Sequence, residues 1–171
     1  MASLFSSLPG ARKATLRLLS ASLACAFLGM GNKPVISVRF YAEANKQDTE
    51  RFARPITLRN PPREAFVESV PTIHEKQIRA VYPFQAKDGS WGCAFKLDNS
   101  GRINLEVVST TRRDGTLVAF VGTKAGVHQA AELFIDKPIR DGIISIPNGL
   151  TELQIAAITK SWPVLGQKKK R

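Results

Sequence analysis

Cysteine is scarce in this sequence, and its scarcity excludes two kinds of structural support. The 171 residues contain only Cys25 and Cys93, with no CxxC pair. If Cys25 is removed with a leader segment, one thiol remains. The chain can then form neither an intramolecular disulfide nor a cysteine-based zinc knuckle. We therefore expect the fold to be held together by its hydrophobic core.

Acidic residues are absent from the first 41 positions, which contain five Lys or Arg and many Ser, Ala and Leu. This composition is typical of a mitochondrial import signal, which acts as a basic amphipathic helix. Residues 11–19 fit such a helix. An Arg stands shortly before an aromatic residue at Arg39-Phe40-Tyr41, which resembles a matrix processing site. We predict that residues 1–41 are a transit peptide cut near Tyr41.

Long apolar runs are also missing. The longest candidate, Leu18 to Met30, has 13 residues, and a helix that spans a bilayer needs about 20. The same run resembles the apolar region of a secretory signal or a short membrane segment. These alternatives, with chloroplast import, stay open beside the predicted location in the mitochondrial matrix or on the matrix face of the inner membrane.

The strong positive charge is unevenly distributed. The whole chain has a formal net charge of +11, but residues 42–167 contain 16 basic and 14 acidic side chains. The remaining basicity lies in the leader and in a basic tail over residues 168–171. The net charge of the whole chain therefore does not indicate strong, nonspecific attraction of polyanions by the folded part.

The pattern after residue 42 predicts a polar flexible arm over residues 42–70, with one or two helical turns from residue 63, and a domain over 71–167. Apolar residues recur at every second position near 78–84, 91–97, 103–107 and 117–121, which is typical of strands with one buried face. Turn-forming residues at 87–90, 98–101 and 112–115 separate them. Residues 130–135 fit either a strand or a short helix, and 143–146 fit a short strand. Successive hairpins of this kind predict an antiparallel meander.

The last element has helical spacing. Thr151 with Gln154 three positions later matches a capping box, and Pro163 ends the helix. The side chains expected to pack on the sheet are Leu153, Ala157, Ile158 and Trp162. The predicted fold class is therefore α+β, an antiparallel β-meander sheet packed by a C-terminal α-helix.

Residues suited to catalysis are few. His74 and His128 are the only histidines, and His128 with Glu132 has the spacing of two ligands on one helical face. A pair without a third ligand is usually a solvated surface pair. Cys93 alternates in phase with Trp91 and Phe95, which favours burial over reactivity. We predict no enzyme activity, no catalytic residue, no metal and no cofactor.

Aromatic and basic residues are interleaved around the predicted hairpins. This mixture is typical of single-strand binding, in which bases stack on rings and cations contact phosphates. The alternative is that the rings face the core while the charges are solvated. The candidate nucleic-acid-binding residues are Lys87, Trp91, Lys96, Arg102, Arg112, Arg113 and Lys124.

Two segments resemble a known family. Residues 92–97 (GCAFKL) followed by 101–106 (GRINLE) resemble the "GAFKL, turn, G-x-hydrophobic-x-L" strands of the Whirly-like organellar proteins. Residues 146–166 are similar to the closing strand, helix and Pro-x-hydrophobic-Gly end of the same family. The resemblance implies an oligomer that binds single-stranded nucleic acid on its sheets.

Together these observations predict a non-enzymatic mitochondrial protein that binds single-stranded RNA or DNA and acts in an oligomer or larger assembly. The alternative is a structural accessory subunit of a large mitochondrial complex, such as the ATP synthase, the respiratory chain or the mitoribosome. Its partners would then be proteins. Neither hypothesis includes a small-molecule substrate.

Overall fold

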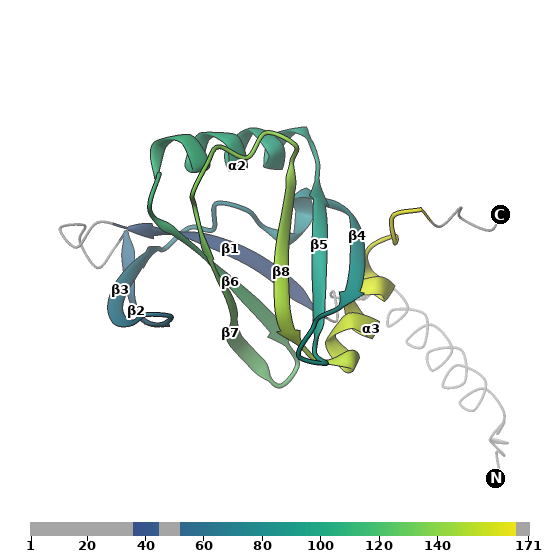
Figure 1. The fold of residues 1–171 in the computed structure, drawn as a ribbon. Helices are drawn as coiled ribbons and strands as arrows, with labels where there is room; N and C mark the ends of the chain where they lie inside the picture. Colours follow the sequence, from purple (N-terminus) through teal and green to yellow (C-terminus); the bar gives the residue numbers. More distant parts are fainter. Residues whose placement is uncertain (1–35, 45–51, 167–171) are drawn as a thin grey trace, which may run out of the picture. The chain divides into compact units, whose positions relative to one another are not determined.

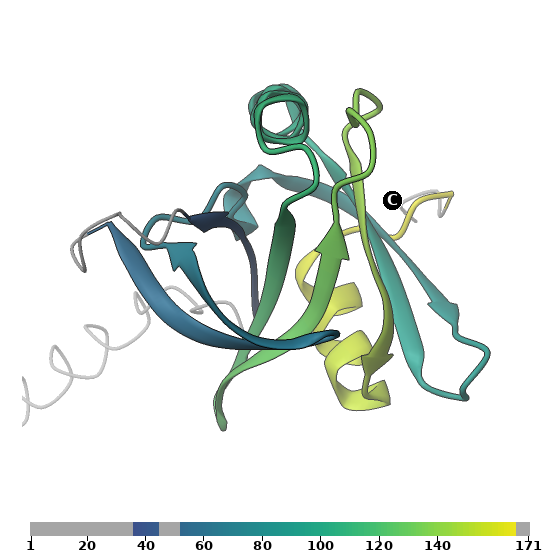
Figure 2. The ribbon, with the colours of Figure 1, turned by 60° about the vertical axis from the view of Figure 1, so that its left-hand side comes forward.

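The computed structural model describes residues 36–44 and 52–166 (Figure 1). In these residues the elements are β1 (Ser37–Ala44), β2 (Ala53–Arg59), β3 (Pro62–Glu68), β4 (Ile78–Gln85), β5 (Trp91–Leu97), α2 (Asn99–Thr111), β6 (Thr116–Thr123), β7 (Gly126–Phe134), β8 (Ile143–Leu150) and α3 (Glu152–Ser161). A large sheet has the strand order β2-β3-β1-β6-β7, and a small sheet has the order β4-β5-β8. Figure 2 shows the two sheets facing each other, with α2 across one end.

β1 lies in the middle of the large sheet. Residues Ser37 to Ala42 pair with β6, and Glu43 and Ala44 pair with β3. Val38 and Phe40 are fully buried, and the Phe40 ring meets that of Phe95 on the small sheet edge to face at 5.9 Å. The predicted cut near Tyr41 falls inside this strand. A cut there would remove the buried side chains of Val38 and Phe40 from the core.

Residues 52–68, predicted as part of a flexible arm, form the β2–β3 hairpin instead. One face of the hairpin buries Leu58, Ala65 and Val67 against Val118 of β6. The helical turns expected from residue 63 are wrong, since that segment is β3. Pro55, Arg59, Pro62 and Glu64 lie on the other face of the hairpin, and these polar and proline residues made the segment resemble an arm.

The small sheet begins with the predicted hairpin. β4 and β5 pair from Ile78–Leu97 to Gln85–Trp91, around the turn at residues 86–90. β8 pairs with the other edge of β5. At the free edge of β4, the chain after α3 adds a short parallel bridge between Val164 and Val81. The segment around Val164 therefore lies beside the outer strand β4 of the small sheet.

The third predicted strand, around residues 103–107, is wrong. Those residues lie in α2, because the Asp98 carboxylate accepts a hydrogen bond from the Gly101 N–H at 2.7 Å and caps a helix. Leu105 and Val108 are buried at helical spacing, whereas Ile103 and Val107 are exposed. The predicted turn at residues 98–101 is thus the start of a helix. Residues 101–106, which resemble a Whirly-like strand in sequence, are helical in this structure.

The C-terminal helix is confirmed, with the predicted capping box between Thr151 and Gln154. Ile155 and Ile158 face the core, but Leu153 is 84% exposed. The expected burial of Leu153 is therefore wrong. The α+β class is confirmed, with mostly antiparallel sheets and a C-terminal helix packed on the sheet.

Candidate binding surfaces

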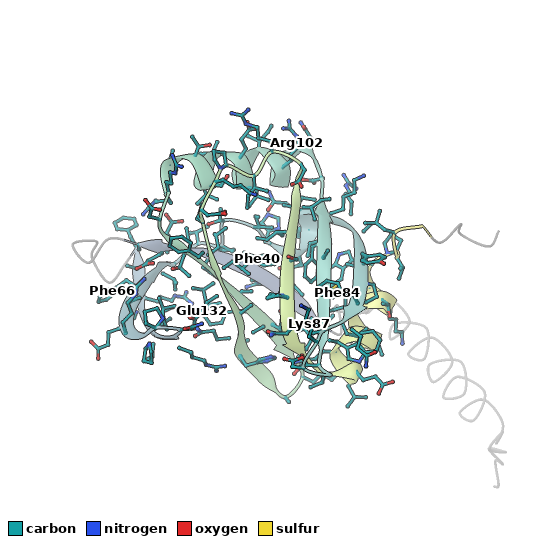
Figure 3. The ribbon with its side chains drawn as sticks, in the orientation of Figure 1. Phe40, Phe66, Phe84, Lys87, Arg102 and Glu132 are labelled. Carbon is teal, nitrogen blue, oxygen red and sulfur yellow. The ribbon has the colours of Figure 1, made fainter. Side chains whose placement is uncertain are left out.

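The seven residues predicted to bind nucleic acid do not form one surface. Lys87 lies in the β4–β5 turn, Lys124 in the β6–β7 turn and Arg113 in the turn after α2. Figure 3 shows Arg102 on α2 far from Lys87. Lys96 lies on β5. A nucleic-acid strand could not touch all of them in one short path.

Two of these arginines are engaged in contacts within the fold. Arg112 donates to the Glu43 carbonyl oxygen at 3.0 Å and to a Glu68 carboxylate oxygen at 2.7 Å, so it ties the end of α2 to β1 and β3. Arg102 contacts Glu106 at 3.3 Å on its own helix. Hydrogen-bonded arginines in such contacts are poorly placed to bind phosphate.

Trp91 lies on the core side of the small sheet. It pairs with Leu150 and Gln85, in phase with buried Cys93, and packs half-buried against the main core. The predicted stacking role of Trp91 is not supported by this placement, since a ring that is packed on the core offers little free face to a base.

The opposite side of the small sheet forms what we call the open face. Three cross-strand rows make it up: Ala80–Lys96–Ile143, Tyr82–Ala94–Ser145 and Phe84–Gly92 with Pro147 beside them. Tyr82 is 54% exposed and Ile143 is 42% exposed. Both helices contribute their buried residues to the core on the other side of the sheet. Exposed apolar side chains on a sheet face of this kind mark interaction sites.

Glycine at position 92 keeps the open face flat. A Cβ atom there would lie 2.4 Å from the Phe84 ring and 2.5 Å from the Pro147 carbonyl oxygen. The Phe84 ring therefore lies directly over the β5 backbone, half-buried. Lys96 is the one charged side chain of the three rows, so the open face is mainly apolar.

The titratable groups with catalytic potential are separated in the described residues. Burial raises the pKa of the Cys93 thiol to about 12, which disfavours the reactive thiolate. His74 caps the short turn at Glu75–Gln77, and His128 lies on strand β7 and contacts Gln154. The helical His128–Glu132 pair is therefore wrong. Residues 36–44 and 52–166 contain no cluster of three potential metal ligands.

Two ion pairs on the large sheet lower carboxylate pKa values. The Arg63 guanidinium lowers the pKa of Glu43, with contacts of 2.6 and 2.8 Å. The Arg39 guanidinium lowers the pKa of Glu75, with contacts of 2.9 and 3.0 Å. The two hydrogen bonds to Glu75 therefore fix the orientation of the Arg39 side chain on β1.

A pocket lies under the β2–β3 hairpin, on the outer face of the large sheet. It contains Tyr41 and residues of β2 and β3, which the sequence analysis assigned to a leader and an arm. The signal that could have located it is the alternation of Ile56 and Leu58 with the more polar Thr57 and Arg59, which is typical of a half-buried strand.

Comparisons with known proteins show a likeness in fold alone. No family model matches the chain, and no curated protein matches its sequence. A solved structure described as "Structure and function of a membrane component SecDF that enhances protein export" has 15% identity and a TM-score of 0.50, covering 96% of this chain and 78% of that chain. A second, "Crystal structure of SecDF in Super-membrane-facing form", has 14% identity and a TM-score of 0.48. That match covers 85% of this chain and 21% of that chain. In the described part of the chain, no helix is long and apolar enough to cross a membrane.

Proposed function

We propose that this protein is a non-enzymatic subunit of a larger assembly and that its open face docks on a protein partner. The observation that carries the proposal is the exposure of Tyr82 and Ile143 on a nearly uncharged sheet face. Exposed apolar side chains in contiguous rows lose favourable burial unless another molecule covers them. A protein partner fits this chemistry best, because aromatic residues are enriched and charges depleted at the centre of protein interfaces.

A second candidate function is binding of single-stranded RNA or DNA, as the sequence predicts. It is favoured by Tyr82 and Phe84, which stand two residues apart on the same face of β4, with Lys96 on the next strand. Two rings and a neighbouring cation are the elements that bind successive bases and phosphates. In the sequence, the basic residues 168–171 follow shortly after the segment that pairs with β4.

For the compartment, we keep mitochondrial import as predicted from residues 1–41, with the processing point moved upstream of Ile36. The alternative, in which residues 18–30 direct export or membrane attachment, remains a competing proposal. The fold likeness to a membrane component described as enhancing protein export is a reason to test that alternative.

Native size-exclusion of cell extract separates the two functions. The wild-type protein should elute in a high-mass assembly that survives RNase and DNase treatment. The double variant Tyr82→Ser, Ile143→Ser should elute as the free protein, because the substitutions remove the two large exposed apolar side chains of the docking surface without touching the core.

The matched control is Leu153→Ser, which also removes an exposed apolar side chain but lies on α3, outside the open face. It should stay in the assembly. A nuclease-sensitive assembly would support the nucleic-acid function, and an assembly unchanged by the double variant would refute docking through the open face.

A further inference from the structure

The β2–β3 hairpin is fixed as an arch over the outer face of the large sheet. At its tip, the Arg59 and Asn60 N–H groups donate to the two carboxylate oxygens of Glu132 on β7, at 2.7 and 3.1 Å. Figure 3 labels Glu132 near this hairpin. The hairpin is therefore held at both ends, by β1 at its base and by β7 at its tip.

A cavity of about 350 Å³ lies between this arch and strands β1 and β6. It contains the rings of Tyr41 and Phe120, which meet edge to face with centroids 5.5 Å apart. Ile56 and Val67 of the hairpin line the opposite wall. This volume is within the range of small-molecule sites, and the mixture of rings and aliphatic walls suits a flat apolar group.

Arg54 places a positive charge in the same cavity. Arg54 is exposed and shares one face of β2 with Ile56 and buried Leu58, so its side chain leaves the strand on the cavity side. Arg39 lines the cavity from β1, but its guanidinium is paired with Glu75. Glu68 is the one acidic residue among those that line the cavity, and its carboxylate is paired with Arg112. Over residues 36–44 and 52–166, no carboxylate forms an ion pair with Arg54.

We propose that this hairpin pocket binds a monoanion with an aromatic body. The carboxylate pairs with Arg54, and the aromatic group lies against Phe120 and Tyr41. Two sources share this chemistry, a free aromatic carboxylate and a polypeptide that ends in an aromatic residue. The pocket is separate from the open face, because the core of the protein lies between the two sheets. The proposal therefore does not depend on the proposed function.

Calorimetric titration of the full-length protein with 3-phenylpropionate tests the pocket. We expect saturable binding that Arg54→Gln weakens by about tenfold or more, since the variant loses the charged partner of the carboxylate. The control Arg79→Gln removes an exposed arginine of β4 and should leave the affinity unchanged. Phe120→Leu, which keeps an apolar side chain, should weaken binding while thermal unfolding stays cooperative.

Two peptide arms identify the source of the ligand. N-acetyl-Ala-Ala-Phe with a free carboxylate should bind, and its C-terminal amide should not. If the tripeptide acid binds more tightly than 3-phenylpropionate, the pocket recognises a polypeptide end, and the reverse order points to a free carboxylate. Equal binding of acid and amide, equal affinity in Arg54→Gln, or no saturable binding of any anion would overturn the proposal.

Discussion

Removal of residues 1–41 is expected to unfold the protein, whereas removal of residues 1–34 should leave it folded. The longer deletion takes away most of β1, including fully buried Val38 and Phe40 and most of the pairing with β6. Truncating a buried Phe to Ala alone costs about 3 to 5 kcal/mol, and a whole domain is stable by only about 5 to 15 kcal/mol. The lost strand is therefore comparable to the total stability.

Circular dichroism and urea unfolding of the two deletion variants provide the measurement. The shorter deletion should show one cooperative transition, and the longer one should show none. N-terminal sequencing of the protein isolated from cells should accordingly find a start at or before Ile36. A cooperative transition in the longer deletion, or a natural start at residue 42, would contradict the assignment of β1.

Ile158→Ala is expected to destabilise the protein by about 2 to 5 kcal/mol, whereas Leu153→Ala should change the stability by less than about 0.5 kcal/mol. Ile158 is fully buried between α3 and the sheets, and Leu153 on the same helix is 84% exposed. Both substitutions leave a helix-favouring alanine, so the comparison isolates burial from helix propensity.

Urea denaturation of the two variants, analysed with a common m-value, gives their free energies of unfolding. Similar values for Ile158→Ala and Leu153→Ala would show that α3 does not pack as described. A large loss for Leu153→Ala would show that Leu153 packs on the sheet, as the sequence pattern predicts.

The sequence predicts elements well where local signals are complete. The β4–β5 hairpin has alternating apolar residues on both sides of a turn, and α3 has a capping box with a proline after it, so both were predicted correctly. Of the four side chains expected to pack on the sheet, Ile158 is buried, and Ala157 and Trp162 are partly buried against the core. Only Leu153 was misplaced, because it lies at helical spacing with Ala157 and the tertiary structure decides where the buried side of the helix ends.

The other errors arise where two periodicities coincide. Ile103, Leu105 and Val107 alternate as in a strand, but the Asp98 cap starts a helix in which Leu105 and Val108 form the buried stripe.

β1 was missed because its residues follow directly after a leader-like segment, and the first acidic residue appears only at Glu43. The open face and the hairpin pocket depend on long-range pairing between strands, for which a single sequence has no local signal.

Photo-crosslinking at Tyr82 is the most direct test of the central claim, that the open face docks on a protein. A benzophenone amino acid placed at position 82 should give a light-dependent adduct in cell extract that protease removes and nucleases leave intact. The same group at position 153, which is more exposed than position 82 and lies on α3, should give no such adduct. A nuclease-sensitive adduct at position 82, or equal crosslinking from both positions, would contradict the claim.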